Sequence, residues 1–216
     1  MRCFAYLHGF ASGPHSRKGV VLEAAFRAEG ATLHLPDLCR PTFGTQTLTG
    51  ALAAIDALVA TSPDDARWCF IGSSLGGWLA ARWAELHPTR AERLVLICPG
   101  FDMVLRWPAL LGADTIARWR TTGALPFKDA AGQWTPLHWG FVADAQQHPP
   151  VPIVPCPTLI LHGTRDTVVP LAFSESYAAA HADRVQLGVL DDAHDLGQSI
   201  PAIEAAVLAF LTPAAP

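Results

Sequence analysis

The feature that most constrains this chain is a Gly-x-Ser-x-Gly segment at residues 72–76, between an apolar run and a helix-like stretch. A strand that turns into a helix this sharply strains its central residue and exposes that residue's side chain above the sheet. Gly72 and Gly76 fit the turn because a side chain at either position would collide where strand and helix pass. A purely structural turn is the alternative. The context favours a nucleophilic Ser74.

Short apolar runs alternate with helix-like stretches along most of the chain, which predicts a mostly parallel α/β sheet flanked by helices on both faces. With 216 residues, the chain is long enough for one domain. Strands are expected at residues 2–7, 32–35, 68–71, 94–98, 158–162 and 185–190. Helices are expected at residues 18–28, 47–60, 75–86, 172–180 and 200–211.

One long segment interrupts this alternation and carries four tryptophans, Trp107, Trp119, Trp134 and Trp139. A structureless loop of that length is unusual in a compact domain, so we expect an inserted cap at 101–155 within a core of 1–100 and 156–216. Inside the insert, helices are predicted at 113–121 and 141–147, with a hairpin turn at Gly132. The Ala/Pro tail after Leu211 is expected to fray.

Composition and charge exclude several classes of function. Half of the residues are apolar and the formal net charge is −4, with no cluster of basic residues, so nucleic acid is not expected as a partner. No segment approaches the ~20 apolar residues of a membrane span. The cysteines, Cys3, Cys39, Cys69, Cys98 and Cys156, are odd in number and lack Cys-x-x-Cys spacing, so neither a disulfide nor a metal is expected. We therefore expect a cytoplasmic protein that does not bind membranes.

A nucleophilic serine requires a base, and the base requires an orienting acid, in the chain order Ser, Asp or Glu, His. Asp166 follows the predicted strand at 158–162, and His194 follows the last predicted strand. Ligand sites form at the carboxyl ends of parallel strands, where both side chains would join Ser74. Asp102 is the rival acid. A helix cap or a turn is the structural alternative for Asp166.

Acyl transfer also requires donors for the developing oxyanion. The backbone N–H of Leu75 is the natural first donor. The loop after the first strand supplies the second, from Phe10 or, alternatively, Ala11. We expect His8 in that loop to be structural and the side chain of Ser73 to point away from that of Ser74.

The motifs His8-Gly9-Phe10, residues 72–77, residues 162–170 and His194 together resemble the α/β-hydrolase superfamily. The loop at 7–16 is similar to that of the small bacterial YqiA-type serine esterases. The resemblance implies a triad of Ser74, His194 and Asp166, no cofactor, and a cap inserted after the sixth strand of the standard fold. The sequence departs from that fold in starting directly at the strand before His8-Gly9, so we expect the usual first two antiparallel strands to be absent. Around His194 the sequence is Asp-Ala-His-Asp, whereas Gly-x-Gly-His is frequent at this position in the superfamily.

These features predict a serine hydrolase that cleaves a small carboxylic ester or thioester through an acyl-Ser74 intermediate. The expected partner is a small-molecule ester with an apolar group, bound in a pocket formed by Trp78, Trp107 and Trp139. The tryptophans of the insert could equally form only its own core. A C–C bond hydrolase using the same triad and a non-catalytic ligand-binding protein are the alternatives. The sequence also leaves a homodimer open.

Overall fold

The computed structural model describes residues 1–212; residues 213–216, in the tail expected to fray, lie outside the described part. Six parallel strands form the central sheet in the order β2-β1-β3-β4-β7-β8. They are β1 (Arg2–Leu7), β2 (Leu33–His34), β3 (Arg67–Ser73), β4 (Ala91–Ile97), β7 (Thr158–Gly163) and β8 (Val185–Leu190). All five strand pairings are parallel, as the alternating pattern predicts.

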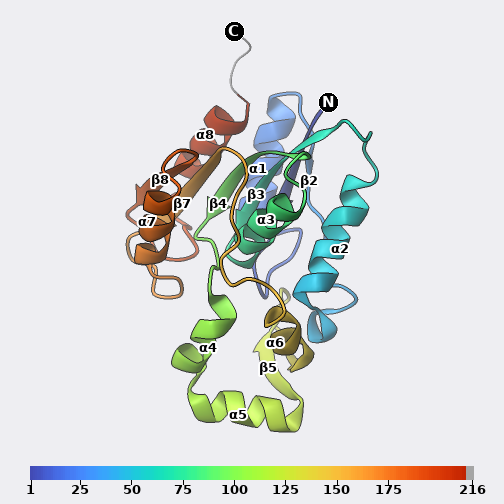
Figure 1. Ribbon diagram of the computed structural model, residues 1–216, viewed down its shortest axis with the longest axis vertical. Helices are drawn as coiled ribbons and strands as arrows, with labels where there is room; N and C mark the ends of the chain where they lie inside the picture. The colour runs from blue at the N-terminus through green and yellow to red at the C-terminus, as the bar shows by residue number, and fades with distance from the viewer. Residues whose placement is uncertain (213–216) are drawn as a thin grey trace.

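Helices cover both faces of the sheet (Figure 1). One face packs on α2 (Leu48–Val59), α3 (Leu75–Leu86) and α7 (Leu171–Ala180), and the other on α1 (Arg17–Ala28) and α8 (Ile200–Leu211). Successive side chains on β1 show the division, since Ala5 joins the first hydrophobic cluster and Tyr6 the second. This alternation explains why the strands are continuously apolar in sequence.

The segment between β4 and β7 extends beyond the carboxyl ends of the strands, at the lower end of Figure 1. It consists of α4 (Met103–Leu111), α5 (Ala113–Thr122), the hairpin of β5 (Ala124–Lys128) and β6 (Trp134–His138), and α6 (Gly140–Ala145). Gly132 has a positive φ of 76° in the hairpin turn, as predicted. The helix α4 was not predicted, because its internal Pro108 argues against a helix in sequence.

Aromatic side chains join the insert to the core. Phe10, in the loop after β1, lies 5.7 Å from Trp107, 5.4 Å from Phe127 and 5.5 Å from Phe141 between ring centroids. Trp107 in turn stacks on Trp119 at 5.3 Å. The insert and the loop after β1 are therefore packed as one hydrophobic cluster.

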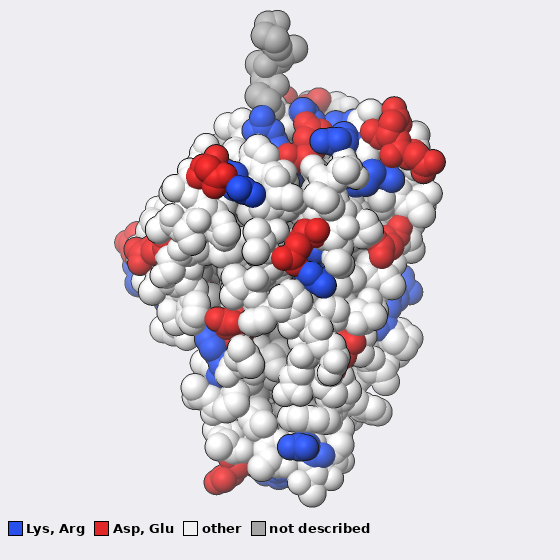
Figure 2. Space-filling model, viewed as in Figure 1, with Lys and Arg blue, Asp and Glu red and all other residues white. Residues whose placement is uncertain are grey.

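Charged side chains of both signs are mixed on the face of the molecule that Figure 2 shows, without a broad area of one sign. Among residues 1–212, no helix is long and apolar enough to cross a membrane.

Candidate active site

The turn from β3 into α3 holds Ser74 with φ 53° and ψ −114°, a conformation that is strained for any residue other than glycine. A Cβ on Gly72 would collide with the backbone of Gly76, and a Cβ on Gly76 would collide with the backbone of Leu7. The turn is fixed further because the Ser74 N–H donates to Ile97 O at 2.8 Å. The sharp strand-to-helix bend predicted at residues 72–76 is therefore present.

The three polar side chains predicted to meet are in hydrogen-bonding contact. His194 Nε2 lies 3.0 Å from Ser74 Oγ, and His194 Nδ1 lies 2.6 Å from Asp166 Oδ2. Since the carboxylate can only accept, Nδ1 carries the proton and Nε2 accepts from the serine hydroxyl. The loops after β3, β7 and β8 supply the three residues, all at the carboxyl ends of the parallel strands.

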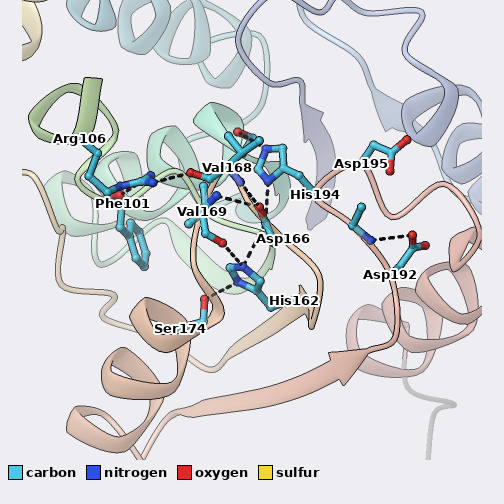
Figure 3. A network of polar contacts seen from close by, with 12 residues as sticks. Phe101, Arg106, His162, Asp166, Val168, Val169, Ser174, Asp192, His194 and Asp195 are labelled. Atoms are coloured by element: carbon cyan, nitrogen blue, oxygen red, sulfur yellow. Dashed lines mark hydrogen bonds and ion pairs between the residues drawn. The ribbon is translucent and has the colours of Figure 1, made fainter. Parts of the chain in front are cut away.

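Asp166 is held as a carboxylate by a dense set of donors (Figure 3). Its Oδ1 accepts from the N–H groups of Val168 and Val169 at 2.8 and 2.7 Å, while His162 Nε2 lies 3.2 Å from Oδ2. Burial by itself would raise the pKa of Asp166, but hydrogen bonds from His162, His194 and Val169 outweigh it and hold that pKa far below its usual range. Asp166 therefore stays ionised at neutral pH.

His162 is a second histidine on this carboxylate, and sequence reasoning gave it no role. Its ring is fully buried. The Nε2–H group donates to Val169 O at 2.8 Å, and Nδ1 lies 2.7 Å from Ser174 Oγ. The sequence motif at 162–170 does show that this histidine stands four residues before Asp166, at the end of a predicted strand. Nothing in sequence says that such a side chain turns toward the acid.

Cys98, just after β4, also approaches this group. Its Sγ, a carboxylate oxygen of Asp166 and a ring nitrogen of His194 all lie within 4.8 Å of one another. Burial, together with the charge of Asp166, raises the pKa of Cys98 to about 12, so the thiol stays protonated. A neutral thiol adds no charge beside the carboxylate.

The backbone N–H groups of Leu75, Phe10 and Ala11 make no hydrogen bond within residues 1–212. Leu75 is the first residue of α3, where an N–H has no partner within the helix. Ala11 has a positive φ of 57°, which bends the loop after β1. The expected oxyanion donors are therefore unpaired, and Phe10 and Ala11 remain alternatives.

His8 is structural, as predicted. Its buried Nε2 accepts from the Leu38 N–H at 3.1 Å, and Nδ1 lies 3.0 Å from Gly9 O. Burial lowers the pKa of His8, which keeps the ring neutral. His8, Asp37 and Cys39 bring three potential metal ligands within 4.8 Å of one another, but the Nε2 lone pair already serves Leu38.

Asp102, the rival acid, lies at the start of α4 with φ 58°. His194 Nδ1–H donates to Asp166, so Asp102 does not occupy the acid's position. Asp102 instead lines a pocket of about 160 Å³ between the core and the insert.

The three tryptophans predicted to form a substrate pocket separate in the structure. Trp78 lines the 160 Å³ pocket, with its indole N–H donating to Pro149 O at 3.2 Å. Trp107 and Trp139 do not line it; both pack on Trp119 within the aromatic cluster, at 5.3 and 5.6 Å. Trp107 is buried in this cluster, whereas Trp139 is half-buried and meets Trp119 edge to face, so of the three only Trp78 lines this pocket. Trp134 lies apart at 68% exposure.

Known structures share this fold. Mouse alpha/beta hydrolase domain-containing protein 10 is 20% identical with a TM-score of 0.72, covering 94% of this chain and 87% of its own. Est1E from Butyrivibrio proteoclasticus is 21% identical with a TM-score of 0.71, covering 97% and 87%. A structure from work on LipS and LipT, described as metagenome-derived lipolytic enzymes, is 22% identical with a TM-score of 0.74, covering 97% and 93%.

These likenesses show the α/β-hydrolase fold, here with an all-parallel six-stranded sheet within the described residues. The model of the Uncharacterised protein family UPF0227 matches residues 3–212, nearly the whole chain. The chain thus belongs to the UPF0227 family and has the α/β-hydrolase fold.

Proposed function

We propose that this protein is a serine hydrolase that cleaves a small carboxylic ester or thioester through an acyl-Ser74 intermediate. The observation that carries the proposal is the continuous hydrogen-bonded chain from Ser74 Oγ through His194 to Asp166, at 3.0 and 2.6 Å. The strained backbone of Ser74 and the unpaired N–H groups beside it support the same reading.

In the proposed reaction, His194 Nε2 takes the proton of Ser74 as Oγ attacks the carbonyl carbon. The oxyanion accepts hydrogen bonds from the N–H of Leu75 and that of Phe10, or of Ala11 in its place. His194 then protonates the leaving alcohol or thiol, leaving acyl-Ser74. Asp166 keeps the imidazole in the required tautomer and stabilises its charged form. A water deprotonated by His194 releases the acid in the second half.

The insert at 101–155 is proposed to act as a cap over this site. Supporting this role, α4 and the segment after α6 together form much of the wall of the 160 Å³ pocket, which also includes Leu75. Two similar structures, 21–22% identical to this chain, are described as lipolytic and as Est1E with bound ferulic acid, and they favour a carbonyl substrate.

The test is covalent labelling with a fluorophosphonate probe, together with turnover of p-nitrophenyl acetate, for the wild type and Ser74→Ala. We expect both signals in the wild type and neither in Ser74→Ala. Ser73→Ala is the matched control and should retain both. A folded wild-type protein that neither labels nor turns over any ester would favour the non-catalytic binder.

The role of Asp166 is tested by Asp166→Asn against Asp102→Asn. Losing the acid costs roughly 10⁴-fold in kcat in a Ser-His-Asp enzyme, because the imidazole takes the wrong tautomer. We expect a loss of that order in Asp166→Asn and less than about tenfold in Asp102→Asn. The reverse ranking would assign the acid to Asp102.

A further inference from the structure

A pocket of about 160 Å³ lies between α3 and the insert, one residue away from the nucleophile. Its wall includes Leu75, whose N–H is a proposed oxyanion donor, and Gly100, whose N–H donates to Ser74 O at 2.8 Å. A Cβ placed on Gly100 would lie 3.2 Å from the amide nitrogen of Leu75. The pocket therefore adjoins the backbone that would hold a reacting carbonyl group.

We infer that this pocket binds the acyl group of the substrate and selects an uncharged apolar acyl group about as large as a benzene ring. The inference rests on the proposed function. It adds the class of acyl group in the substrate and the residues that determine this specificity.

We assign the pocket to the acyl group, and not to the leaving group, because two catalytic loops do not contribute to the pocket wall. The leaving group must lie within reach of His194, which protonates it. No residue of the Asp166 loop (163–170) or of the His194 loop (191–198) is among those lining the pocket. A group in this pocket therefore lies on the side of the carbonyl away from His194.

The size class follows from the volume. A closed apolar cavity of about 150 Å³ in another protein binds benzene. A pocket of about 160 Å³ therefore holds a phenyl ring or an alkyl chain of roughly four to six carbons. Its mouth passes Leu105, which is 64% exposed, and the exposed Gln146, so a longer chain would extend into water.

The preference for a neutral group follows from the wall chemistry. Leu75, Trp78, Met103 and Val104 supply mostly apolar surface, and Asp102 is the one carboxylate in the wall. The wall holds no lysine or arginine, and burial lowers the pKa of its one histidine, His148, so placing an anion against these apolar side chains and a carboxylate is unfavourable.

The first experiment compares p-nitrophenyl esters of increasing acyl length on the wild-type protein. Each buried methylene contributes about 0.8 kcal/mol, or about fourfold, so kcat/KM should rise on the order of 100-fold from acetyl to hexanoyl. It should then level off, because further carbons stay in water. Benzoyl should behave like hexanoyl. Acetates of alcohols of increasing length should show no comparable rise.

Variants on α4 test whether the residues that line the pocket determine the preferred acyl length. Val104→Trp fills the pocket and should lower the hexanoyl-to-acetyl ratio of kcat/KM at least tenfold. Leu110→Trp adds the same side chain to the same helix at a position 47% exposed and outside the pocket wall, and should keep the wild-type ratio. Met103→Ala enlarges the pocket and should move the plateau to longer chains, which keeps the test decisive if Val104→Trp does not fold.

Charge selection is tested with a succinyl ester and the 4-methylpentanoyl ester, which share one heavy-atom skeleton. The wild type should favour the neutral ester by at least tenfold, and Asp102→Asn should narrow that ratio. Equal rates in the wild type would overturn the proposed preference.

The outcomes separate this inference from the proposed function. A protein that labels at Ser74 and cleaves acetyl esters, but shows a flat acyl series or a rise only in the alcohol series, overturns the acyl pocket alone. A folded protein that neither labels nor cleaves any ester overturns the proposed function, and the acyl pocket with it.

Discussion

At the scale of the residue, Asp166 receives more hydrogen bonds than the orientation of His194 requires. Besides the hydrogen bond from His194, it accepts from two backbone N–H groups, and Nε2 of the buried His162 ring lies 3.2 Å from its Oδ2. His162 is itself fixed by Val169 O and Ser174. Since His162 acts through Asp166 and is buried beneath it, we regard it as a positioning residue.

His162→Phe should lower kcat roughly 10- to 100-fold and leave KM nearly unchanged. A polar contact with a charged group contributes about 1.5–3 kcal/mol, and losing the one from His162 loosens the Oδ2 side of the carboxylate, which orients His194. His162→Gln can still place an N–H near the Nε2 position and should recover part of the rate. The check is steady-state kinetics of both variants beside their thermal unfolding. If both variants lost the same fraction of the rate, in proportion to their loss of thermal stability, His162 would have a role in packing only.

The depressed pKa of Asp166 also makes stability depend on pH. A carboxyl group whose pKa is lower in the folded than in the unfolded state stabilises the fold above its unfolded pKa, about 3.9. That stabilisation declines as the pH falls below this value toward the folded pKa. Urea unfolding at pH 6 and pH 3 should show a larger loss of stability in the wild type than in Asp166→Asn. Identical pH dependence in the two proteins would mean that the hydrogen bonds to Asp166 do not stabilise its ionised form.

At the scale of the element, the β3–α3 turn depends on close backbone contact. Gly76→Ala should destabilise the protein by about 3–5 kcal/mol, since its Cβ would collide with the backbone of Leu7, which cannot move without displacing β1. Gly140→Ala is the matched control: at the start of α6 nothing lies within 4 Å of the added Cβ, and stability should change by less than about 1 kcal/mol. Chemical denaturation compares the two, and a Gly76→Ala loss as small as that of Gly140→Ala would contradict this account.

At the scale of the whole molecule, the insert shares its hydrophobic cluster with the sheet. Trp107, Trp119 and Phe141 of the insert belong to the same buried cluster as Leu7 and Phe70 of the strands. A shared cluster predicts that insert and core unfold together, because neither buries its apolar surface alone.

When the core tryptophans Trp68, Trp78 and Trp83 are replaced by phenylalanine, the remaining tryptophans all lie in the insert. Tryptophan fluorescence then reports on the insert alone. In that variant, urea unfolding followed by fluorescence should coincide with unfolding followed by far-UV circular dichroism. An earlier fluorescence transition would instead show that the insert unfolds as a separate unit.

Local patterns in the sequence determined the strand–helix alternation, the sharp turn at Ser74 and the chain order Ser74, Asp166, His194. They did so because strand runs, helical faces and the glycines of a tight turn act over a few residues. Only the tertiary structure decided that Asp166 rather than Asp102 meets His194, that His162 lies against Asp166, and that Trp107 is buried against Trp119. Those outcomes depend on contacts between distant segments, as between Ser74 and His194, 120 residues apart, and sequence spacing does not specify which side chains then face one another.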